Sequence, residues 1–364
     1  MTLLQLTTTQ KLSRARSDLR MGAPVVINDD KNYLLFAVET LNATQLDEIQ
    51  NQYTDVRLII SERRASTLKI PCYDGPFAQI SIKGGVEFDW VRCVADPSKD
   101  LSRGPLGPFQ ILRNTATGLE NQVLTLLKSA ELLPAAIMVA QDSTDKQIEL
   151  HSITLLHSTE LLQLTTKPIR FEETIAARLP LKTSHNGRLH VFKSNSGGQD
   201  HYAMVIGRPK RQQPVTVRLH SACFTGDVLG SLKCDCGAQL DAALKYMAEV
   251  KSGILLYLNQ EGRGIGLANK MRAYSLQDKG FDTVEANHRL GFEDDERDFR
   301  IGAEILKKLG FHKIRLMTNN PNKIQMLQKQ GLVVTERVPL QIHPNPENTS
   351  YLTTKARKSG HLLK

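Results

Sequence analysis

The sequence lacks a long hydrophobic run. Its longest apolar stretch, from Leu132 to Ala140, is interrupted by Pro134 and is far shorter than the roughly 20 residues that a membrane-spanning helix requires. The segment from Met1 to Gln10 lacks the hydrophobic region and cleavage signal of a secretory leader, and the basic residues that follow it resemble a transit peptide only faintly. We therefore expect a cytoplasmic protein with no membrane partner.

Aromatic residues are also scarce, at 5% of the chain with a single Trp. The net charge is +9, which raises the question of a nucleic-acid partner. However, the basic residues are scattered and mixed with acidic ones, so a polyanionic small substrate or a solvated basic surface explains the charge equally well. We expect no nucleic-acid partner, although charge alone does not decide the matter.

Cysteine is the third scarce residue type, and the five cysteines are unevenly spaced. Cys72 and Cys93 are isolated, whereas Cys223, Cys234 and Cys236 form a cluster. An odd number of cysteines without a secretory leader is typical of reduced thiols in a cytosol rather than of a disulfide framework.

The pattern of apolar segments predicts an α/β (α+β) fold in two domains. The 364 residues suffice for about two domains of ~150 residues each. Short apolar segments alternate with helical stretches in both halves, and we expect the boundary near residue 170, which gives domains 1–168 and 169–364. In the second half the spacing predicts helices over Ala238–Val250, Gly264–Lys279 and Asp295–Leu309, and strands over Gly253–Leu258, Lys313–Met317 and Val333–Val338.

The clustered cysteines have the spacing C-x10-C-x-C. Three thiolates bind a soft divalent ion such as zinc and leave its fourth position for water, which the metal makes acidic enough to supply hydroxide. The spacing also fits a closed structural zinc site completed by a histidine such as His220, or three unconnected buried thiols. The spacing alone does not choose among these interpretations.

Two expected strand-to-helix turns carry groups suited to an anion. In the first, Gln260 to Gly266, glycines let backbone amides approach a phosphate, and Arg263 adds a forked positive charge. The second runs from Thr318 to Lys323, where a lysine in the first helical turn opposes the helix dipole, so an anionic ligand would explain it. The simpler interpretations are a glycine-rich turn without a ligand and a solvated surface lysine.

An acidic run, Asp294-Asp295-Glu296-Arg297-Asp298, is expected at the start of a helix. Acidic residues are common there because they complement the positive end of the helix. The functional interpretation is a carboxylate base beside Arg297, and periodicity cannot choose between the two.

Residues 171–364 contain an ordered series of short motifs. They are Arg218-Leu219-His220-Ser221, Cys234-Asp235-Cys236-Gly237, Gln260 to Leu267, Arg272-Ala273-Tyr274, Asp282 to Asn287, Asp295 to Phe299, Thr318-Asn319-Asn320-Pro321 and Glu336 to Leu340. Each motif is weak on its own, but the ordered set is highly specific. Taken together and in this order, the motifs closely resemble GTP cyclohydrolase II.

The resemblance implies an enzyme that hydrolyses GTP to 2,5-diamino-6-(5-phosphoribosylamino)pyrimidin-4-one, formate and pyrophosphate, the first step of riboflavin biosynthesis. It implies one zinc ion per subunit, held by Cys223, Cys234 and Cys236, whose hydroxide attacks the imidazole-ring carbon of guanine. It further implies a magnesium ion with the triphosphate and a homodimer.

The resemblance also assigns catalytic and binding roles. It assigns the ring-opening hydrolysis to Tyr274, proton acceptance to Asp295, and attack on the α-phosphate to Arg297. A guanidinium stays protonated below pH ~12, so simple phosphate stabilisation is the more ordinary role for this arginine. The expected GTP contacts are Arg218, Gln239, Glu261, Gly262, Arg263, Thr283, Thr318 and Lys323.

Residues 1 to about 165 resemble dihydroxybutanone phosphate synthase more weakly. The likeness lies in Gly22 to Ile27, Phe36 to Glu39 and Leu132 to Val139. The acidic loop with which that enzyme binds magnesium is shortened here to Asp29-Asp30-Lys31-Asn32-Tyr33.

Two of the synthase's functional groups are missing. Its Gly-His-Thr-Glu motif reads Gly118-Leu119-Glu120-Asn121 here, and its later glutamate aligns with Ala140. Neither Leu119 nor Ala140 can bind magnesium or carry a proton. We expect this domain to be inactive as a synthase and to serve folding, dimerisation or regulation.

Two positions depart from the cyclohydrolase pattern. Many relatives have Glu at Ala222 and Arg at Asn259, which bears on substrate affinity and choice. One alternative is therefore a paralogue acting on another purine or pyrimidine nucleotide. Another is a zinc-stabilised nucleotide sensor or RNA-binding protein, which the basic pI suggests and which predicts steeply salt-dependent binding of nucleic acid.

Overall fold

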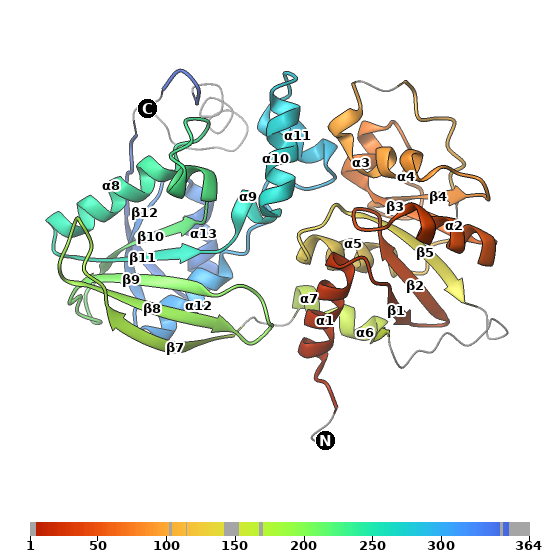
Figure 1. Cartoon of the computed structure of the whole chain (residues 1–364). Coiled ribbons are helices and arrows are strands. Elements are labelled where there is room, and N and C mark those ends of the chain that lie inside the picture. The colour runs from red at the N-terminus through yellow and green to blue at the C-terminus, as the bar shows by residue number, and fades with distance from the viewer. Residues whose placement is uncertain are drawn as a thin grey trace. The chain divides into compact units, whose positions relative to one another are not determined.

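The computed structural model describes residues 5–101, 104–113, 115–141, 153–166, 170–342 and 345–348. The chain divides into two compact units. Unit 1 comprises residues 1–168 and 268–295, and unit 2 comprises residues 169–267 and 296–364. The predicted boundary between Pro168 and Ile169 lies outside the described residues. Two sheets with helices around them confirm the predicted α/β class (Figure 1).

Unit 1 contains a six-stranded sheet and short helices. Its elements are α1 (Thr8–Arg20), β1 (Val25–Asn28), β2 (Asn32–Ala37), α2 (Ala43–Gln52), β3 (Val56–Ser61), α3 (Glu62–Thr67), β4 (Phe77–Ile82), α4 (Phe88–Ala95), η1 (Pro97–Lys99), α5 (Glu120–Ser129), β5 (Ala135–Gln141), β6 (Thr154–His157), α6 (Ser158–Leu161), α7 (Gln163–Thr166), most of α10 (Gly266–Gln277) and α11 (Thr283–Arg289).

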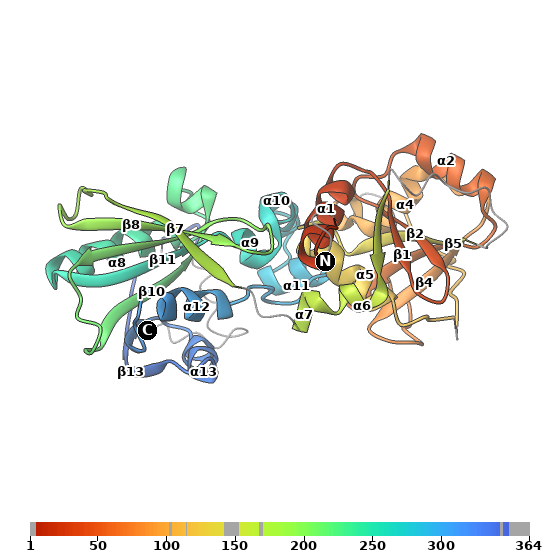
Figure 2. The ribbon, with the colours of Figure 1, turned by 90° about the horizontal axis from the view of Figure 1, so that it is seen from below.

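The sheet of unit 1 has the strand order β4-β3-β5-β2-β1-β6 and is mostly antiparallel, with β1 and β6 parallel. Because side chains alternate along a strand, Val25 and Ile27 pack on one face with α1 and α5. Val26 packs on the other face with residues of α2 and α4. Figure 2 shows these two helices above strands β1 and β2. The sheet is therefore buried on both faces.

Unit 2 is built on a seven-stranded mixed sheet. Its elements are β7 (Phe171–Arg178), β8 (Gly187–Ser194), β9 (His201–Gly207), β10 (Val215–Ser221), η2 (Phe224–Val228), α8 (Cys236–Glu249), β11 (Ser252–Leu258), α9 (Glu261–Gly264), α12 (Arg300–Lys308), β12 (Lys313–Met317), α13 (Pro321–Lys329) and β13 (Val333–Val338).

In unit 2 the strand order is β13-β12-β10-β11-β9-β8-β7. Strands β7 to β9 form an antiparallel meander, and β10 to β13 run parallel. Helix α8 packs on one face, and α12 and α13 pack on the other. Loops that follow the parallel strands therefore emerge together at one edge, which is where the candidate site lies. None of the helices in the described ranges combines the length and apolarity needed to cross a membrane.

Most predicted elements of unit 2 are present, but the start of one helix was wrong. The predicted helix from Asp295 begins only at Arg300. The backbone of Glu296 donates instead to the carbonyl of Arg263, at 3.0 Å. The Asp298 carboxylate accepts from the backbone N–H of Arg300 at 2.9 Å, as a capping side chain does. One tertiary contact, at Glu296, and one local contact, at Asp298, thus replace the first turn of the predicted helix.

Candidate functional site

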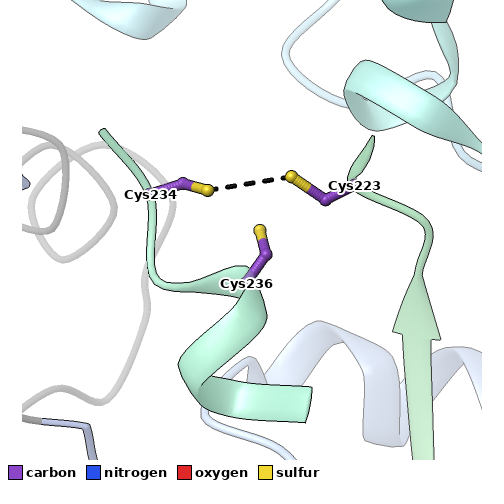
Figure 3. Close-up of side chains that lie close together, drawn as sticks. All are labelled: Cys223, Cys234 and Cys236. Carbon is purple, nitrogen blue, oxygen red and sulfur yellow. Dashed lines mark hydrogen bonds between the residues drawn. The ribbon is translucent and has the colours of Figure 1, made fainter. Parts of the chain in front are cut away.

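The three clustered cysteines converge between β10 and α8, with their sulfurs directed at one another (Figure 3). All three Sγ atoms lie within 4.8 Å of one another, and those of Cys223 and Cys234 are 3.7 Å apart. Zinc–sulfur bonds of about 2.3 Å place two ligands of a tetrahedral ion about 3.8 Å apart. The thiols therefore fit one ion, and the interpretation of three unconnected thiols was wrong.

A glycine makes room for these sulfurs. A Cβ at Gly226 would lie 2.8 Å from the sulfur of Cys234 and 3.1 Å from that of Cys223. The contacts with the Cys223 and Cys234 sulfurs, followed by burial, raise the pKa of the Cys236 thiol. Three thiolates at this spacing repel one another, so a bound cation is what would favour their ionised form.

A buried hydrogen-bond network supports the first cysteine. The Asp227 carboxylate accepts from the backbone N–H of Cys223 and from the hydroxyl of Tyr257, both at 3.0 Å. It also lies 3.0 Å from Nε2 of His220. This histidine faces Asp227, and the convergent set found in the described residues contains no histidine. His220 is thus paired with Asp227 and does not belong to the set of converging thiols.

The network was not anticipated from the sequence. Burial lowers the pKa of His220, which favours a neutral ring that donates through Nε2 to Asp227. The sequence signal was Gly226-Asp227, a turn pair that lies between two of the clustered cysteines. Residues that support metal ligands in this way are usually found only once the fold is known.

Arg218 and Gln239 lie together beside the cysteines. The Arg218 guanidinium donates to the carbonyl of Met317 at 3.1 Å and to the side chain of Gln239, which donates in turn to Asp235. Burial lowers the pKa of Arg218 to about 10, so it stays charged at neutral pH. Its Nε has no hydrogen-bond partner among the described residues. A buried donor left unpaired is costly, and a polar ligand would complete it.

The glycine-rich turn is strained and is hydrogen-bonded to the loop that carries Cys223. Gly262 and Arg263 both have left-handed backbone angles, with φ of 62° and 63°. For a non-glycine residue this costs roughly 1–3 kcal/mol, and such strain clusters at functional sites. The Glu261 carboxylate accepts from the backbone N–H of Phe224 at 2.6 Å, directly after Cys223. Glu261 is thus bonded to the residue next to Cys223, and Gly262 and Arg263 follow it directly in the chain.

The second turn holds a buried lysine. Lys323 is 7% exposed, and its Nζ lies 3.4 Å from the carbonyl of Leu219 and 4.7 Å from the ring centre of Phe299. The interpretation of a solvated surface lysine was therefore wrong. Thr318 accepts from the backbone N–H of Asn320 at 3.0 Å and so shapes the turn. A buried cation in the first turn of α13 suits an anionic ligand.

The predicted catalytic residues are divided between the units. Arg297 lies in unit 2, where its Nη1 donates to the Ser221 hydroxyl at 3.2 Å. Tyr274, Thr283 and Asp295 lie in unit 1. Tyr274 is half-buried on α10, Thr283 begins α11 and Asp295 is exposed.

Comparisons with known proteins identify the family. The sequence profile described as GTP cyclohydrolase II matches residues 172–339. The GTP cyclohydrolase-2 of Azospirillum brasilense is 39% identical over 370 residues, which covers 97% of this chain and 94% of that protein. The chain belongs to the GTP cyclohydrolase II family. This confirms the predicted family and the prediction that the chain is an enzyme.

Two further relatives match different lengths of this chain. The GTP cyclohydrolase-2 of Cronobacter sakazakii is 56% identical over 172 residues, covering 47% of this chain and 87% of that protein. The riboflavin biosynthesis protein RibBA of Endomicrobium trichonymphae is 44% identical over 261 residues, covering 68% of this chain and 64% of that protein. The second match is too long to lie within residues 169–364, so the similarity to RibBA extends into the N-terminal half.

Proposed function

We propose that this member of the family hydrolyses GTP to 2,5-diamino-6-(5-phosphoribosylamino)pyrimidin-4-one, formate and pyrophosphate in a zinc-dependent reaction. The observation that carries the proposal is the convergence of Cys223, Cys234 and Cys236 around Gly226, within the segment that matches the family. Zinc held by these thiols would supply a Lewis acid and an acidified water.

The buried polar groups of unit 2 would bind the nucleotide. The unpaired Nε of Arg218, with Gln239 beside it, would hydrogen-bond an acceptor of GTP. The cationic groups of Arg263 and Lys323 would bind phosphate oxygens. Because Arg218 and Gln239 are hydrogen-bonded in place before the ligand arrives, little conformational entropy of these side chains is lost on binding.

A further set of residues completes the proposed GTP contacts. Glu261, Gly262 and Thr318 lie in the two turns described above, and Thr283 lies in unit 1. A magnesium ion would accompany the triphosphate, because hard cations prefer phosphate oxygens and water.

The proposed reacting groups are Tyr274, Asp295 and Arg297. Tyr274 would assist the hydrolysis that opens the imidazole ring, and the carboxylate of Asp295 would accept a proton from water. Arg297, held by Ser221, would stabilise charge on the α-phosphate as pyrophosphate leaves. We further propose a cytoplasmic homodimer that does not bind nucleic acid.

A second candidate substrate class follows from one observation. The family resemblance leads us to expect Arg at Asn259. The backbone N–H of Asn259 donates to Nδ1 of His201 at 3.0 Å, and its side chain donates to the carbonyl of Asp200 at 2.5 Å. This side chain therefore anchors its loop and adds no charge. A nucleotide with fewer phosphates or another base is the alternative substrate that this change favours.

The test is turnover by the zinc-loaded chain with magnesium and a panel of nucleotides, with formate, pyrophosphate and the pyrimidine measured. Cys234→Ser should lower GTP turnover by at least ~10³-fold, because the metal contributes several kcal/mol to the barrier. Cys72→Ser, at an isolated thiol in unit 1, should retain activity. Turnover of another nucleotide but not GTP would establish the alternative, and zinc binding without any turnover would refute both.

A further inference from the structure

Residues 268–295, which we call the inserted segment, belong to the family-matching range 172–339 but pack in unit 1. The segment comprises most of α10, all of α11 and the residues that lead to Asp295. It contains Tyr274, Thr283 and Asp295, three of the groups proposed above to act on GTP. Its contacts with the N-terminal half therefore bear on the reaction.

Helix α10 is held by two acidic side chains of the N-terminal half. Arg272 donates through Nη1 to Glu39 at 2.9 Å and through Nε to Asp96 at 3.1 Å. The other oxygen of Glu39 accepts from the backbone N–H of Leu133 at 2.7 Å, which fixes the carboxylate. Asn269, fully buried, donates to the carbonyl of Glu131 at 2.9 Å. Both anchored residues lie on α10 shortly before Tyr274.

Helix α11 and the residues after it lie beside α3 (Figure 1). Arg63 forms a forked ion pair with Glu293, with atoms 2.6 to 3.1 Å apart. The buried Arg64 pairs with Asp100 at 2.7 and 2.9 Å, and Asp100 lies 3.4 Å from Nη1 of Arg289. Charged contacts thus connect α3 with Arg289, at the end of α11, and with Glu293, after the turn that follows α11.

The backbone of Gly291 also lies close to side chains of the N-terminal half. The hydroxyl of Ser61 donates to the carbonyl of Gly291 at 2.8 Å. A Cβ at Gly291 would lie 2.6 Å from that hydroxyl oxygen and 2.7 Å from a ring carbon of Pro134. The approach requires glycine, so the fit is specific to this position.

The inserted segment needs such support. Helices α10 and α11 have 12 and 7 residues. Isolated helices shorter than ~12–15 residues are marginal in water, so their position must come from tertiary contacts. Within unit 1 those contacts come from residues 39–134, which lie in the synthase-like half.

We propose that the N-terminal half is a positioning scaffold for the inserted segment, with Glu39 and Arg63 as positioning residues. This rests on the proposed function, because the segment matters to catalysis only if Tyr274, Thr283 and Asp295 act on GTP. The half that lacks the synthase groups is then part of the cyclohydrolase. Neither positioning residue touches substrate; each acts through the helix that it holds.

The experiment compares full-length, zinc-loaded chains by hydrogen exchange and by GTP kinetics. The variants are Glu39→Gln with Arg63→Glu, Arg63→Glu alone, and the charge swap Arg63→Glu with Glu293→Arg. The matched control is Arg57→Ala, whose ion pair with Asp55 lies in unit 1 and involves no residue of the inserted segment.

In the first variant, amides of residues 268–295 should exchange about tenfold faster, because net hydrogen-bond contributions are lost at two places. The value of kcat should fall by a similar factor and more than KM rises, while zinc content and exchange in unit 2 stay unchanged. The charge swap should recover both readouts relative to Arg63→Glu. The control should match the wild type.

Unchanged exchange in the inserted segment would overturn the proposal, as would faster exchange with an unchanged kcat. Exchange that spreads over all of unit 1 would show general destabilisation and would also overturn it. A wild-type chain that does not hydrolyse GTP would refute the proposed function and the catalytic role of the scaffold. The exchange result would still show separately whether the segment is anchored.

Discussion

The two units use their buried polar groups differently. In unit 2, Arg218 is buried with a donor left unpaired, and Lys323 is a buried cation in the first turn of a helix. In unit 1, the positions that the synthase resemblance associates with catalysis are apolar or structural. Leu119 is 1% exposed within the hydrophobic core, and Ala140 packs against the same core.

Glu120, the residue after Leu119, also has a structural role. Glu120 is fully buried and accepts from the backbone N–H groups of Thr117 and Gly118, both at 3.1 Å. Its carboxylate therefore stabilises the start of α5. The positions that the synthase resemblance associates with catalysis thus hold core and capping residues here. Other charged groups of the same unit, the buried Arg64 and the partly buried Asp100, contact the inserted segment at Arg289.

The strongest test of unit 2 is Gly226→Ala. The added methyl would lie 2.8 Å from the sulfur of Cys234 and 3.1 Å from that of Cys223. We therefore expect the affinity for zinc to fall ~10–100-fold, and GTP turnover to fall with it. Zinc titration by a competing chelator measures this. Gly198→Ala, which meets nothing closer than 3.8 Å, is the control and should bind zinc normally. Normal zinc affinity in Gly226→Ala would mean that the thiols do not share an ion.

The matching test of unit 1 restores the missing histidine. Leu119→His should lower the free energy of unfolding by about 3 kcal/mol, because it buries a polar ring among apolar side chains. Denaturant unfolding measures the loss. Leu119→Met, which conserves volume, should cost less than ~1.5 kcal/mol. A stable Leu119→His chain with synthase activity would break the comparison, because the synthase surface would then still be present.

The smallest expected effect is a difference between the two units in how their stability depends on pH. Burial lowers the pKa of His201 to about 4, and its neutral Nδ1 accepts from the backbone N–H of Asn259. Stability from a histidine with a lowered pKa is present above its unfolded pKa of about 6.5 and is lost as pH falls toward 4. In unit 1, Arg63 lowers the pKa of Glu293, so that contribution is lost only below about 4.5.

Lowering the pH from 7 to 5 should therefore weaken unit 2 first. We expect a loss of about 2 kcal/mol, seen as faster hydrogen exchange in β9 and β11, with little change around Glu293. His201→Gln keeps an acceptor for Asn259 but does not titrate, and it should abolish the difference. Equal acceleration in both units, or no effect of His201→Gln, would contradict this assignment.

Local sequence patterns were sufficient for much of unit 2. Strands β12 and β13 have the predicted bounds, and the spacing of Cys223, Cys234 and Cys236 correctly indicated convergence. These features depend on residues close in sequence, where periodicity and spacing are informative. The family resemblance then supplied the class of enzyme.

Features that depend on distant contacts were not predictable. The helix expected from Asp295 is displaced because the backbone of Glu296 pairs with Arg263. The burial of Lys323 depends on Leu219, 104 positions away. The contacts of the inserted segment join residues up to 233 positions apart, for which a single sequence carries no signal.

These separations also order events during synthesis of the chain. Cys223 and Cys234 are 11 positions apart, so the proposed metal site needs little more than its own loop. Arg272 follows its partner Glu39 by 233 positions, which at ~5–20 residues per second corresponds to roughly 10 to 50 s of translation. The N-terminal sheet can therefore fold before the inserted segment leaves the ribosome. In a circularly permuted chain that began with the C-terminal half, the inserted segment would leave the ribosome before the N-terminal sheet had been synthesised.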